Sequence, residues 1–415
     1  MNRRLSAQGR LILYTALAHG LVHTVELTYA ALLLRIGDEF GQGEFVLGVV
    51  ANAFAFTFGA SALPAGLLVD RLGSRRVITF TFLAASASAF LVGISPSTAV
   101  LGVFLGLLGL SIGLYHPAGL SLIAQGAAQR GLALGYHGVA GNLGIALAPA
   151  LATGLAAAID WRAAYFFLAA LCLGLVALLQ AIHLPEGGRP APAEGRAPAP
   201  PTSAGASLLP LVLVYGVFVL NGFIYRGSLT FLPAHIEEKV HISLWGIDES
   251  AVAGSLTTVA LLAGAAGQYF GGNLAQRHAL ERVAPPLALA LVPALLLMGV
   301  SGGLALVAAS AAFVFFNFSG QPVYTSLIAE YSPRGAVGRS YGISFFAAFG
   351  LGSSAASVAG FFAEQWGTSS VFPVLAGFAL LSLSLAVAIW RLAQRPRAAP
   401  PVERPLPATG GGATG

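Results

Sequence analysis

Charge is scarce in this sequence, and lysine and cysteine are almost absent from it. Only 9% of the 415 residues are charged, 56% are hydrophobic, and the mean hydropathy is +0.80. Because soluble domains carry about 25% charged residues, this composition excludes a soluble globular protein. The single cysteine, Cys172, cannot form an intramolecular disulfide, so the cysteines do not indicate a redox compartment.

The positive charge is almost wholly arginine, since Lys239 is the only lysine. The arginines lie in short gaps between apolar runs, which favours a role in membrane orientation over a nucleic-acid partner. With a cytoplasmic N-terminus, seventeen positive residues fall on the cytoplasmic side and three, Arg35, Arg162 and Lys239, on the outer side. Membrane proteins concentrate positive residues on the cytoplasmic side. We therefore expect a multi-pass protein of the inner (plasma) membrane, in contact with the lipid bilayer, with both termini in the cytoplasm.

Apolar runs that are long enough to cross a bilayer recur twelve times. They lie at about 11–34, 45–69, 77–95, 98–124, 131–158, 163–183, 207–233, 250–275, 283–301, 303–329, 340–363 and 369–390. A segment rich in proline, alanine and glycine, 185–206, predicts a cytoplasmic linker after the sixth run. The expected fold is an all-α membrane protein with twelve transmembrane helices in two pseudo-symmetric six-helix bundles, residues 1–184 and 207–392, and a disordered cytoplasmic tail, 393–415. The first run contains Glu26 and is too long for a signal peptide, so we expect it to be retained.

The two halves of the chain repeat one another. Gly113-Leu-Tyr-His-Pro117 corresponds to Phe318-Ser-Gly-Gln-Pro322 at an offset of 205 residues. Gly66-Leu-Leu-Val-Asp70-Arg71 corresponds to Gly272-Asn-Leu-Ala-Gln276-Arg277 at an offset of 206. Parallel six-helix repeats are the architecture of one class of secondary transporters, which bind their substrate between the halves near the middle of the membrane.

One loop carries a resemblance to a family. Gly66-Leu-Leu-Val-Asp70-Arg71-Leu-Gly73-Ser-Arg75-Arg76 resembles the signature loop of the major facilitator superfamily in its glycines, its Asp-Arg pair and its basic cluster. The resemblance implies a transporter fold in which this loop is a conformational latch, formed by Gly66, Asp70, Arg71, Gly73, Arg75 and Arg76. Asp70 could pair with an arginine or cap a helix N-terminus across the interface between the halves. Gln276 replaces this acid in the second half, so we expect a weaker latch there.

A narrower resemblance is to the fosmidomycin-resistance group of drug exporters. It rests on His19 and on Tyr115-His116-Pro117, Arg130-Gly131 and Gly141-Asn142-Leu143-Gly144. In the fifth run, Gly135, Gly144 and Pro149 also keep the spacing of a family pattern that is associated with antiporters. The resemblance implies proton-coupled efflux of a drug or metabolite, and with it antibiotic resistance. This chain departs from the group, where an Asn-Asp pair follows the first histidine: Val22-His23 stand here, and the acid comes one turn later at Glu26.

The first apolar run carries three ionisable side chains on one helix face. His19, His23 and Glu26 lie four and three residues apart. Glu26 is the only one of the sixteen acids that lies deep inside an expected span, a costly position unless the group faces a cavity or a partner. We predict that Glu26, with His23 and His19, takes up and releases a proton as it is exposed to each side in turn.

The predicted substrate site draws polar side chains from both halves and suits a small polar or amphipathic molecule. The first half contributes His19, His23, His116, Tyr115, His137 and Asn142. The second half contributes Asn221, Tyr225, Arg226, Asn317, Gln321 and Tyr324. Arg226 either pairs with Glu26 or extends outward to the membrane surface, and the sequence leaves both arrangements open.

Two other functions fit the same cluster. His19 and His23 have metal-ligand spacing on a helix, and Glu26 or His116 could complete a site. An importer or exporter of a metal ion or metal chelate is therefore the alternative. A membrane metalloenzyme is the third interpretation, but no His-Glu-x-x-His, nucleophile-elbow or nucleotide-loop motif accompanies the cluster. We expect no enzyme activity, no cofactor, and a monomer whose partners are a small-molecule substrate and protons.

Overall fold

The computed structural model describes residues 6–182, 184, 208–242, 246–333 and 337–394. Within them it has twelve helical spans that are long and apolar enough to cross a membrane, which confirms the predicted number. The same residues contain no strand. The predicted linker 185–206 and almost all of the predicted tail 393–415 lie outside the described residues.

Each half of the chain forms one bundle. The first contains α1 (Ala7–Ala31), α2 (Leu33–Phe40), α3 (Glu44–Leu72), α4 (Ser74–Gly93), α5 (Thr98–Gly113), α6 (Tyr115–Gly126), α7 (Arg130–Ala158) and α8 (Trp161–Ala181). The second contains α9 (Leu209–Lys239), α10 (Glu249–Arg277), α11 (Leu280–Val300), α12 (Gly303–Tyr331), α13 (Val337–Phe345), η1 (Phe346–Gly350), η2 (Leu351–Ser354), α14 (Ala355–Trp366), η3 (Thr368–Ser370) and α15 (Val371–Ala393).

Glycines and capping side chains set several helix ends. Gly41, Gly73 and Gly367 adopt φ angles of +60°, +82° and +80°, which glycine reaches without steric cost. They end α2, α3 and α14. Asp160 and Asp248 accept hydrogen bonds from first-turn amides of α8 and α10, and so satisfy donors that have no partner within the helix.

The fourth span is broken at Leu114, directly before Tyr115-His116-Pro117. Proline has no backbone N–H and restricts the residue that precedes it. The helix therefore stops at Gly113 and resumes at Tyr115 as α6, which packs against α1, α3 and α7. The break places Tyr115 and His116 in the first turn of α6, within the first bundle and next to α1.

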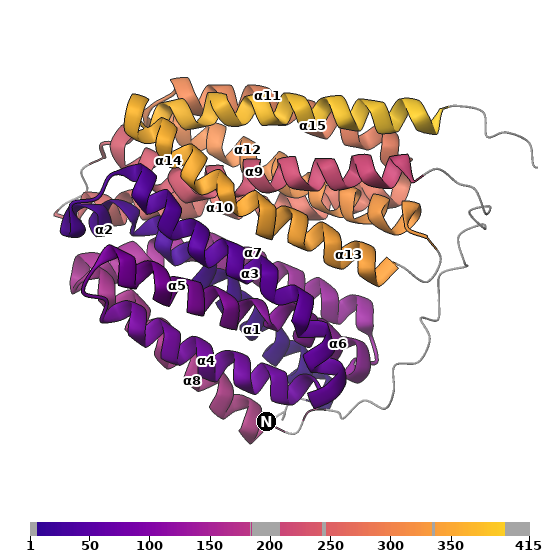
Figure 1. The fold of residues 1–415 in the computed structure, drawn as a ribbon, viewed down its shortest axis with the longest axis horizontal. Helices are drawn as coiled ribbons and strands as arrows, with labels where there is room; N and C mark the ends of the chain where they lie inside the picture. The colour runs from indigo at the N-terminus through magenta and orange to yellow at the C-terminus, as the bar shows by residue number, and fades with distance from the viewer. Residues whose placement is uncertain (1–5, 183, 185–207, 243–245, 334–336, 395–415) are drawn as a thin grey trace, which may run out of the picture.

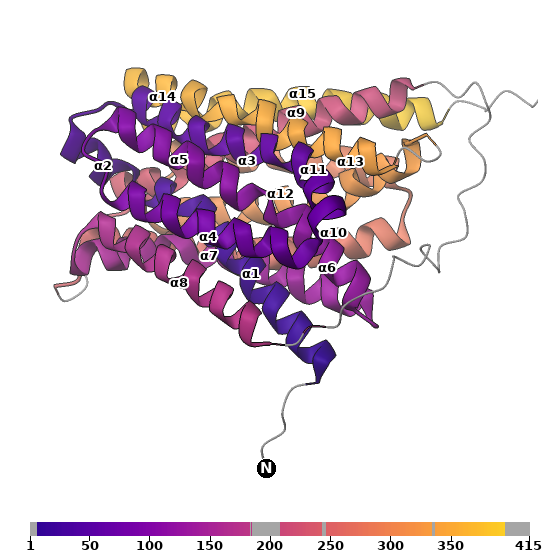
Figure 2. The ribbon, with the colours of Figure 1, turned by 60° about the horizontal axis from the view of Figure 1, so that its bottom comes forward.

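The two bundles lie side by side, the first from indigo to magenta and the second from pink to yellow (Figure 1). The start of α1, the end of α8, the start of α9 and the end of α15 lie toward one side, which we call the terminus side. The opposite side, near α2 and α14, is the far side. The bundles meet toward the far side, where α3 packs on α14 and α7 on α10, and their axes diverge toward the terminus side (Figures 1 and 2).

Backbone contacts bring the bundles together on the far side. A Cβ atom on Gly48 of α3 would overlap the carbonyl of Ala356 on α14. One on Gly360 of α14 would overlap the carbonyl of Glu44. Because glycine alone permits such an approach, these two positions let α3 and α14 touch through their backbones.

An ion pair adds to this closure. The Arg35 guanidinium on α2 lies 2.7 Å from Oδ1 of Asp248, the residue that caps α10. Arg35 also donates to the Ser250 hydroxyl and, at 3.3 Å, to the Ala156 carbonyl. The hydrogen bonds from Ser250 and Arg35 hold the pKa of the Asp248 carboxyl below its usual range. The pair is therefore charged at neutral pH and joins the two bundles.

Candidate functional site

A buried ion pair connects the bundles near the middle of the structure. Nη2 of Arg226 on α9 donates to Oε1 of Glu26 on α1 at 2.7 Å. Arg226 is 6% exposed and Glu26 is 4% exposed. Because little water reaches them, each charge is stabilised mainly by the other. Of the two arrangements that the sequence leaves open for Arg226, the structure has the pairing with Glu26. Glu26 therefore lies at the interface between the bundles, not against lipid.

Histidines extend this pair into the first bundle. Oε2 of Glu26 lies 2.6 Å from Nδ1 of His23. Nε2 of His23 is 3.2 Å from Nε2 of His19, which is itself 3.4 Å from Nε2 of His116. His19 also stacks on His137, with ring centroids 3.7 Å apart. The structure thus brings the four predicted intramembrane histidines together beside Glu26.

The positions of the hydrogens on two of these rings follow from their partners. Nδ1 of His19 faces the backbone carbonyl of His137 at 2.7 Å, so it must carry a hydrogen to donate. Nδ1 of His23 faces a carboxylate that is ionised by Arg226, so it must also donate. When neutral, both rings therefore present a bare Nε2, and these two atoms face one another at 3.2 Å. A proton or a metal ion between the two Nε2 atoms could complete this arrangement.

Three histidine nitrogens also satisfy the basic requirement of a metal site. One ring nitrogen each from His19, His23 and His116 lies within 4.8 Å of the other two. Neutral imidazole nitrogen is a common ligand of zinc and other transition metals. Glu26 is not part of this group of three, because both of its oxygens are engaged by Arg226 and His23.

Aromatic side chains surround the histidines. The Tyr115 hydroxyl donates to the Thr15 carbonyl at 2.8 Å and lies 3.5 Å from Nε2 of His137. His116 packs against Phe58, with ring centroids 5.4 Å apart, and against Phe345 of the second bundle at 5.5 Å. The cluster is therefore enclosed by apolar rings and reaches the second bundle through Phe345 as well as through Arg226.

Small residues on α7 make room for the cluster. A Cβ on Gly141 would approach the His19 ring to 2.5 Å. A Cβ on Gly144 would overlap the carbonyl of Gly20, and Thr24 donates to the Gly144 carbonyl at 3.3 Å. The close approach of α1 and α7 depends on these glycines. Of the pattern Gly135, Gly144 and Pro149 predicted in the fifth run, Gly144 contacts the histidine-bearing helix, whereas a Cβ on Gly135 would have no neighbour within 4 Å among the described residues.

The other predicted substrate residues are spread more widely. Asn142 donates to Gln268 of α10, across the bundle interface. Tyr225 is 9% exposed and packs beside Arg226, Phe318 and Phe349. Asn142 therefore contacts the other bundle, whereas Tyr225 lies next to Arg226 within its own bundle.

Four residues of the second half are not drawn into the cluster. Asn221 accepts a hydrogen bond from Ser382 of α15 at 3.0 Å, and Tyr324 donates to the Ala284 carbonyl at 3.4 Å. Both contacts lie inside the second bundle, where Tyr324 packs in an apolar core. Asn317 is half-buried on α12 and Gln321 is exposed. Polarity in an apolar span did not distinguish residues that pack within a bundle from residues at the interface.

The predicted latch lies at the junction of α3 and α4, on the terminus side. Gly73 makes the turn, with φ of +82°, whereas Gly66 is inside α3. Asp70 and Arg71 are exposed. Arg75 donates to the Leu179 carbonyl of α8 at 2.7 Å, within its own bundle. The role of Gly66, Asp70, Arg71, Gly73, Arg75 and Arg76 as a latch between bundles stays a prediction.

Several residues at the interface were not foreseen from the sequence. Gln268, the partner of Asn142, is an amide within an apolar span, a signal that sequence reasoning could have used. The contact of Arg35 with Asp248 joins residues more than two hundred positions apart, and no local pattern indicates it. Phe345 is one of 26 phenylalanines, and its type alone does not single it out.

Comparison with known proteins identifies the family. The family model described as Major Facilitator Superfamily matches residues 15–248 and 245–412. The chain belongs to the major facilitator superfamily. Members of this superfamily are secondary transporters built from two six-helix halves, and the architecture of this chain agrees with that description.

Curated relatives of this superfamily member carry transport names. A protein of Cupriavidus necator named "Probable sulfoacetate transporter SauU" is 27% identical over 62% of this chain and 61% of its own length. A "Probable sugar efflux transporter" of Helicobacter pylori is 24% identical over 66% of this chain and 68% of its own length. A "Multidrug resistance protein B homolog" of Mycobacterium tuberculosis is 26% identical over 46% of this chain and 34% of its own length. The chain thus spans about three fifths of the length of the first of these relatives.

Solved structures share the fold over almost the whole chain. A bacterial homologue of the human lysosomal transporter Spinster, in an inward-facing and occupied conformation, has a TM-score of 0.75 and 16% identity, and the match covers 94% of this chain and 98% of that chain. The nucleoside transporter NupG has a TM-score of 0.73 and 12% identity, over 92% of this chain and 100% of that chain. Family and fold neighbours are transporters rather than enzymes.

Proposed function

We propose that this protein is a secondary active transporter that moves a small molecule across the cytoplasmic membrane by alternating access, in exchange for protons. The observation that carries the proposal is the chain of contacts from Arg226 through Glu26 and His23 to His19. In this proposal, the proton-binding group lies on one bundle and its counter-charge, Arg226, lies on the other. Proton binding and bundle motion are thereby linked through one set of atoms.

The proton site is the pair of facing nitrogens on His19 and His23. Their Nε2 atoms lie 3.2 Å apart, and neither carries a hydrogen when both rings are neutral. One added proton forms a hydrogen bond between them, and the nearby Glu26 carboxylate stabilises the resulting positive charge. From His23 Nδ1, a proton can pass to Oε2 of Glu26 at 2.6 Å.

Protonation of Glu26 is the step that releases the bundles. A neutral carboxyl group no longer offers a charge to Arg226, which then lacks a buried counter-ion. The two bundles separate on the far side so that the guanidinium regains water. In the predicted orientation the far side faces outward, so a conformation that is closed on the far side is inward-facing. In this proposal the outward-facing state binds the proton and the inward-facing state releases it to the cytoplasm.

We infer the substrate class from the side chains that surround the Glu26–Arg226 pair. Arg226, histidine rings and the aromatic side chains of Tyr225 and Phe345 suit a small polar or amphipathic molecule with an acidic or hydrogen-bonding group. Relatives named for sulfoacetate, for sugar efflux and for multidrug resistance support a solute of this size. The resemblance to the fosmidomycin-resistance group supports export, and we assign the protein to drug or metabolite efflux.

Proteoliposomes test this function directly. Purified protein is reconstituted with a pH-sensitive dye inside the vesicles and exposed to a panel of antibiotics, sugars, carboxylates and sulfonates. We expect at least one compound to elicit a proton flux in the wild type. The Glu26→Gln variant should give no flux, while Glu249→Gln, which changes an exposed carboxylate at the start of α10, should behave as the wild type. Full coupling in Glu26→Gln would refute the assignment.

One observation favours a second function, transport of a metal ion. Two ligands of a tetrahedral zinc ion with Zn–N bonds near 2.05 Å lie about 3.3 Å apart. The Nε2 distances of 3.2 Å and 3.4 Å from His19 to His23 and His116 match this spacing. Zinc uptake or release by the same proteoliposomes, lost in His116→Ala and retained in Glu26→Gln, would favour the metal over the proton.

A further inference from the structure

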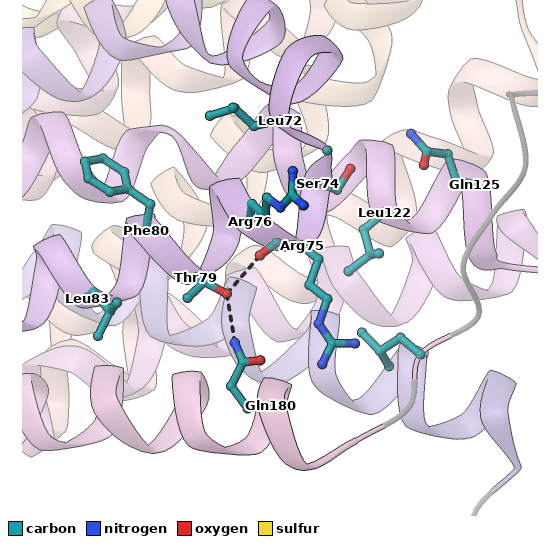
Figure 3. Close-up of a pocket in the computed structure, with 12 residues that line it drawn as sticks. Leu72, Ser74, Arg75, Arg76, Thr79, Phe80, Leu83, Leu122, Gln125 and Gln180 are labelled. Carbon is teal, nitrogen blue, oxygen red and sulfur yellow. Dashed lines mark hydrogen bonds between the residues drawn. The ribbon is translucent and has the colours of Figure 1, made fainter.

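A second polar site lies outside the histidine cluster, on the terminus side of the first bundle. A pocket of about 700 Å³ opens between the start of α4, α6 and the end of α8 (Figure 3). Its polar lining includes Ser74, Arg75, Arg76, Gln125 and Gln180. None of the described residues that line it is acidic. The pocket therefore presents positive charge and hydrogen-bond donors with no nearby carboxylate in its wall.

The helix geometry adds further donors. The helix α4 begins at Ser74 after Gly73, whose φ is +82°, and no side chain caps it. The amides of its first turn therefore lack partners within the helix. A helix N-terminus with free amides attracts anions, because the helix dipole places partial positive charge there. Arg75 and Arg76 are in this same turn.

A buried hydroxyl in the pocket wall indicates a missing ligand. Ser74 is 5% exposed, and its Oγ atom has no hydrogen-bond partner among the residues that the structure describes. Leaving a buried hydroxyl unpaired is unfavourable, so a partner for it is expected. Ser74 lines the pocket beside the arginines (Figure 3), and an anion bound there would offer an acceptor to its hydroxyl.

The rest of the wall is apolar and open to the outside. Leu72, Phe80 and Leu83 line the pocket and are 48%, 60% and 46% exposed. Phe80 and Leu83 belong to α4, a membrane span, so in a bilayer these faces contact acyl chains. A ligand that fits both parts has a negatively charged head and apolar chains.

We propose that this pocket binds the phosphate headgroup of an anionic phospholipid. The phosphate oxygens accept hydrogen bonds from the first-turn amides of α4, from the Ser74 hydroxyl and from Arg76, whose side chain is exposed. Arg75 already donates to the Leu179 carbonyl at 2.7 Å and adds its charge. The acyl chains lie along Phe80 and Leu83. In the predicted orientation this is the cytoplasmic leaflet, whose anionic lipids attract basic pockets between helices.

Lipid binding to the purified protein tests the proposal without any transport assay. Native mass spectrometry compares adducts of phosphatidylglycerol with those of phosphatidylcholine. We expect at least a tenfold preference for phosphatidylglycerol, and a loss of about tenfold in Arg76→Gln. Arg282→Gln is the matched control, since Arg282 lies 206 residues later on α11, at the corresponding position of the repeat. It should leave the preference unchanged.

A second variant and a soluble probe complete the test. Ser74→Ala removes only the unpaired hydroxyl, and we expect it to weaken phosphatidylglycerol binding about three- to tenfold without loss of folding. Equal binding of the two lipids, or wild-type binding by both Arg76→Gln and Ser74→Ala, would overturn the site. Binding of glycerol 3-phosphate as tightly as phosphatidylglycerol would overturn the lipid assignment, because the apolar wall would then contribute nothing.

Discussion

Glu26 on α1 and Arg226 on α9 are joined by a 2.7 Å hydrogen bond between buried opposite charges, one from each bundle. Breaking such a pair by removing one partner costs more than the pair contributes, because it leaves an isolated charge away from water. The pair therefore links the bundles, and in our proposal it is the point at which a single proton changes their energy of association.

The ion pair predicts non-additive stability changes. Arg226→Gln leaves the Glu26 charge without its cation, and we expect the free energy of unfolding to fall by about 3 kcal/mol or more. The double variant with Glu26→Gln should recover most of this loss, since no isolated charge remains. Unfolding of the four proteins in detergent measures the cycle. Additive losses would show that the two side chains do not interact in solution.

The position of His23 between Glu26 and His19 predicts a change in pH dependence. His23→Gln cannot take up a proton and interrupts the contacts between Oε2 of Glu26 and Nε2 of His19. We expect transport driven by a pH gradient to fall at least tenfold and to lose its variation between about pH 5.5 and 8. His241→Gln, at an exposed position after α9, is the control and should keep the wild-type profile. An unchanged pH profile in His23→Gln would show that His23 takes no part in proton transfer.

The glycine contact between α3 and α14 predicts which state a larger residue disfavours. In Gly48→Ala the new methyl group overlaps the Ala356 backbone, so closure of the far side becomes costly and the far-side-open state gains population. Gly154→Ala adds the same methyl on α7, where its Cβ would have no neighbour within 4 Å, and should have no effect. Spin labels at Ile159 and Trp366, which are 76% and 62% exposed, measure the opening after Cys172→Ala. Identical distance distributions in both variants would contradict this role.

The contact of Arg35 with Asp248 predicts a pH-independent contribution to closure. Because the Asp248 pKa is lowered by the hydrogen bonds from Ser250 and Arg35, its charge is present at neutral pH and is lost only as the pH falls through a pKa below the usual range of a carboxyl group. Asp248→Asn should thus weaken closure by a factor of about 1.5–5 while the response to pH between about 5.5 and 8 stays as in the wild type. Loss of the pH response in Asp248→Asn would instead indicate that the proton binds on the far side.

Much of the fold could be predicted because the bilayer imposes simple rules on the chain. Apolar runs of sufficient length, interrupted by arginines, gave twelve spans. The helix-face spacing of His19, His23 and Glu26 is a local property, so it also could be read directly. Their contact with His116 and His137 depends on helix packing through Gly141 and Gly144, which spacing alone does not determine.

Contacts across the bundle interface were the least accessible from sequence. Arg226 had two arrangements available, and only the positions of α1 and α9 decide between them. Asn221 and Tyr324 have the same polar character as Asn142, yet they bond within the second bundle while Asn142 reaches across the interface. Which side of a helix faces its partner bundle is set by the relative rotation of two rigid bodies, and no residue pattern within one helix encodes it.

The effect of pH on the far-side distance tests the central claim most directly, because it needs no substrate. Labels at Ile159 and Trp366 are measured at about pH 8 and about pH 5.5 in lipid nanodiscs, a range over which histidine changes charge. We predict that acidification lengthens the distance in the wild type, and that Glu26→Gln shows the longer distance at both values. A wild-type distance that does not respond to pH, or a Glu26→Gln variant that responds as the wild type does, would contradict the coupling of the proton to the Glu26–Arg226 pair.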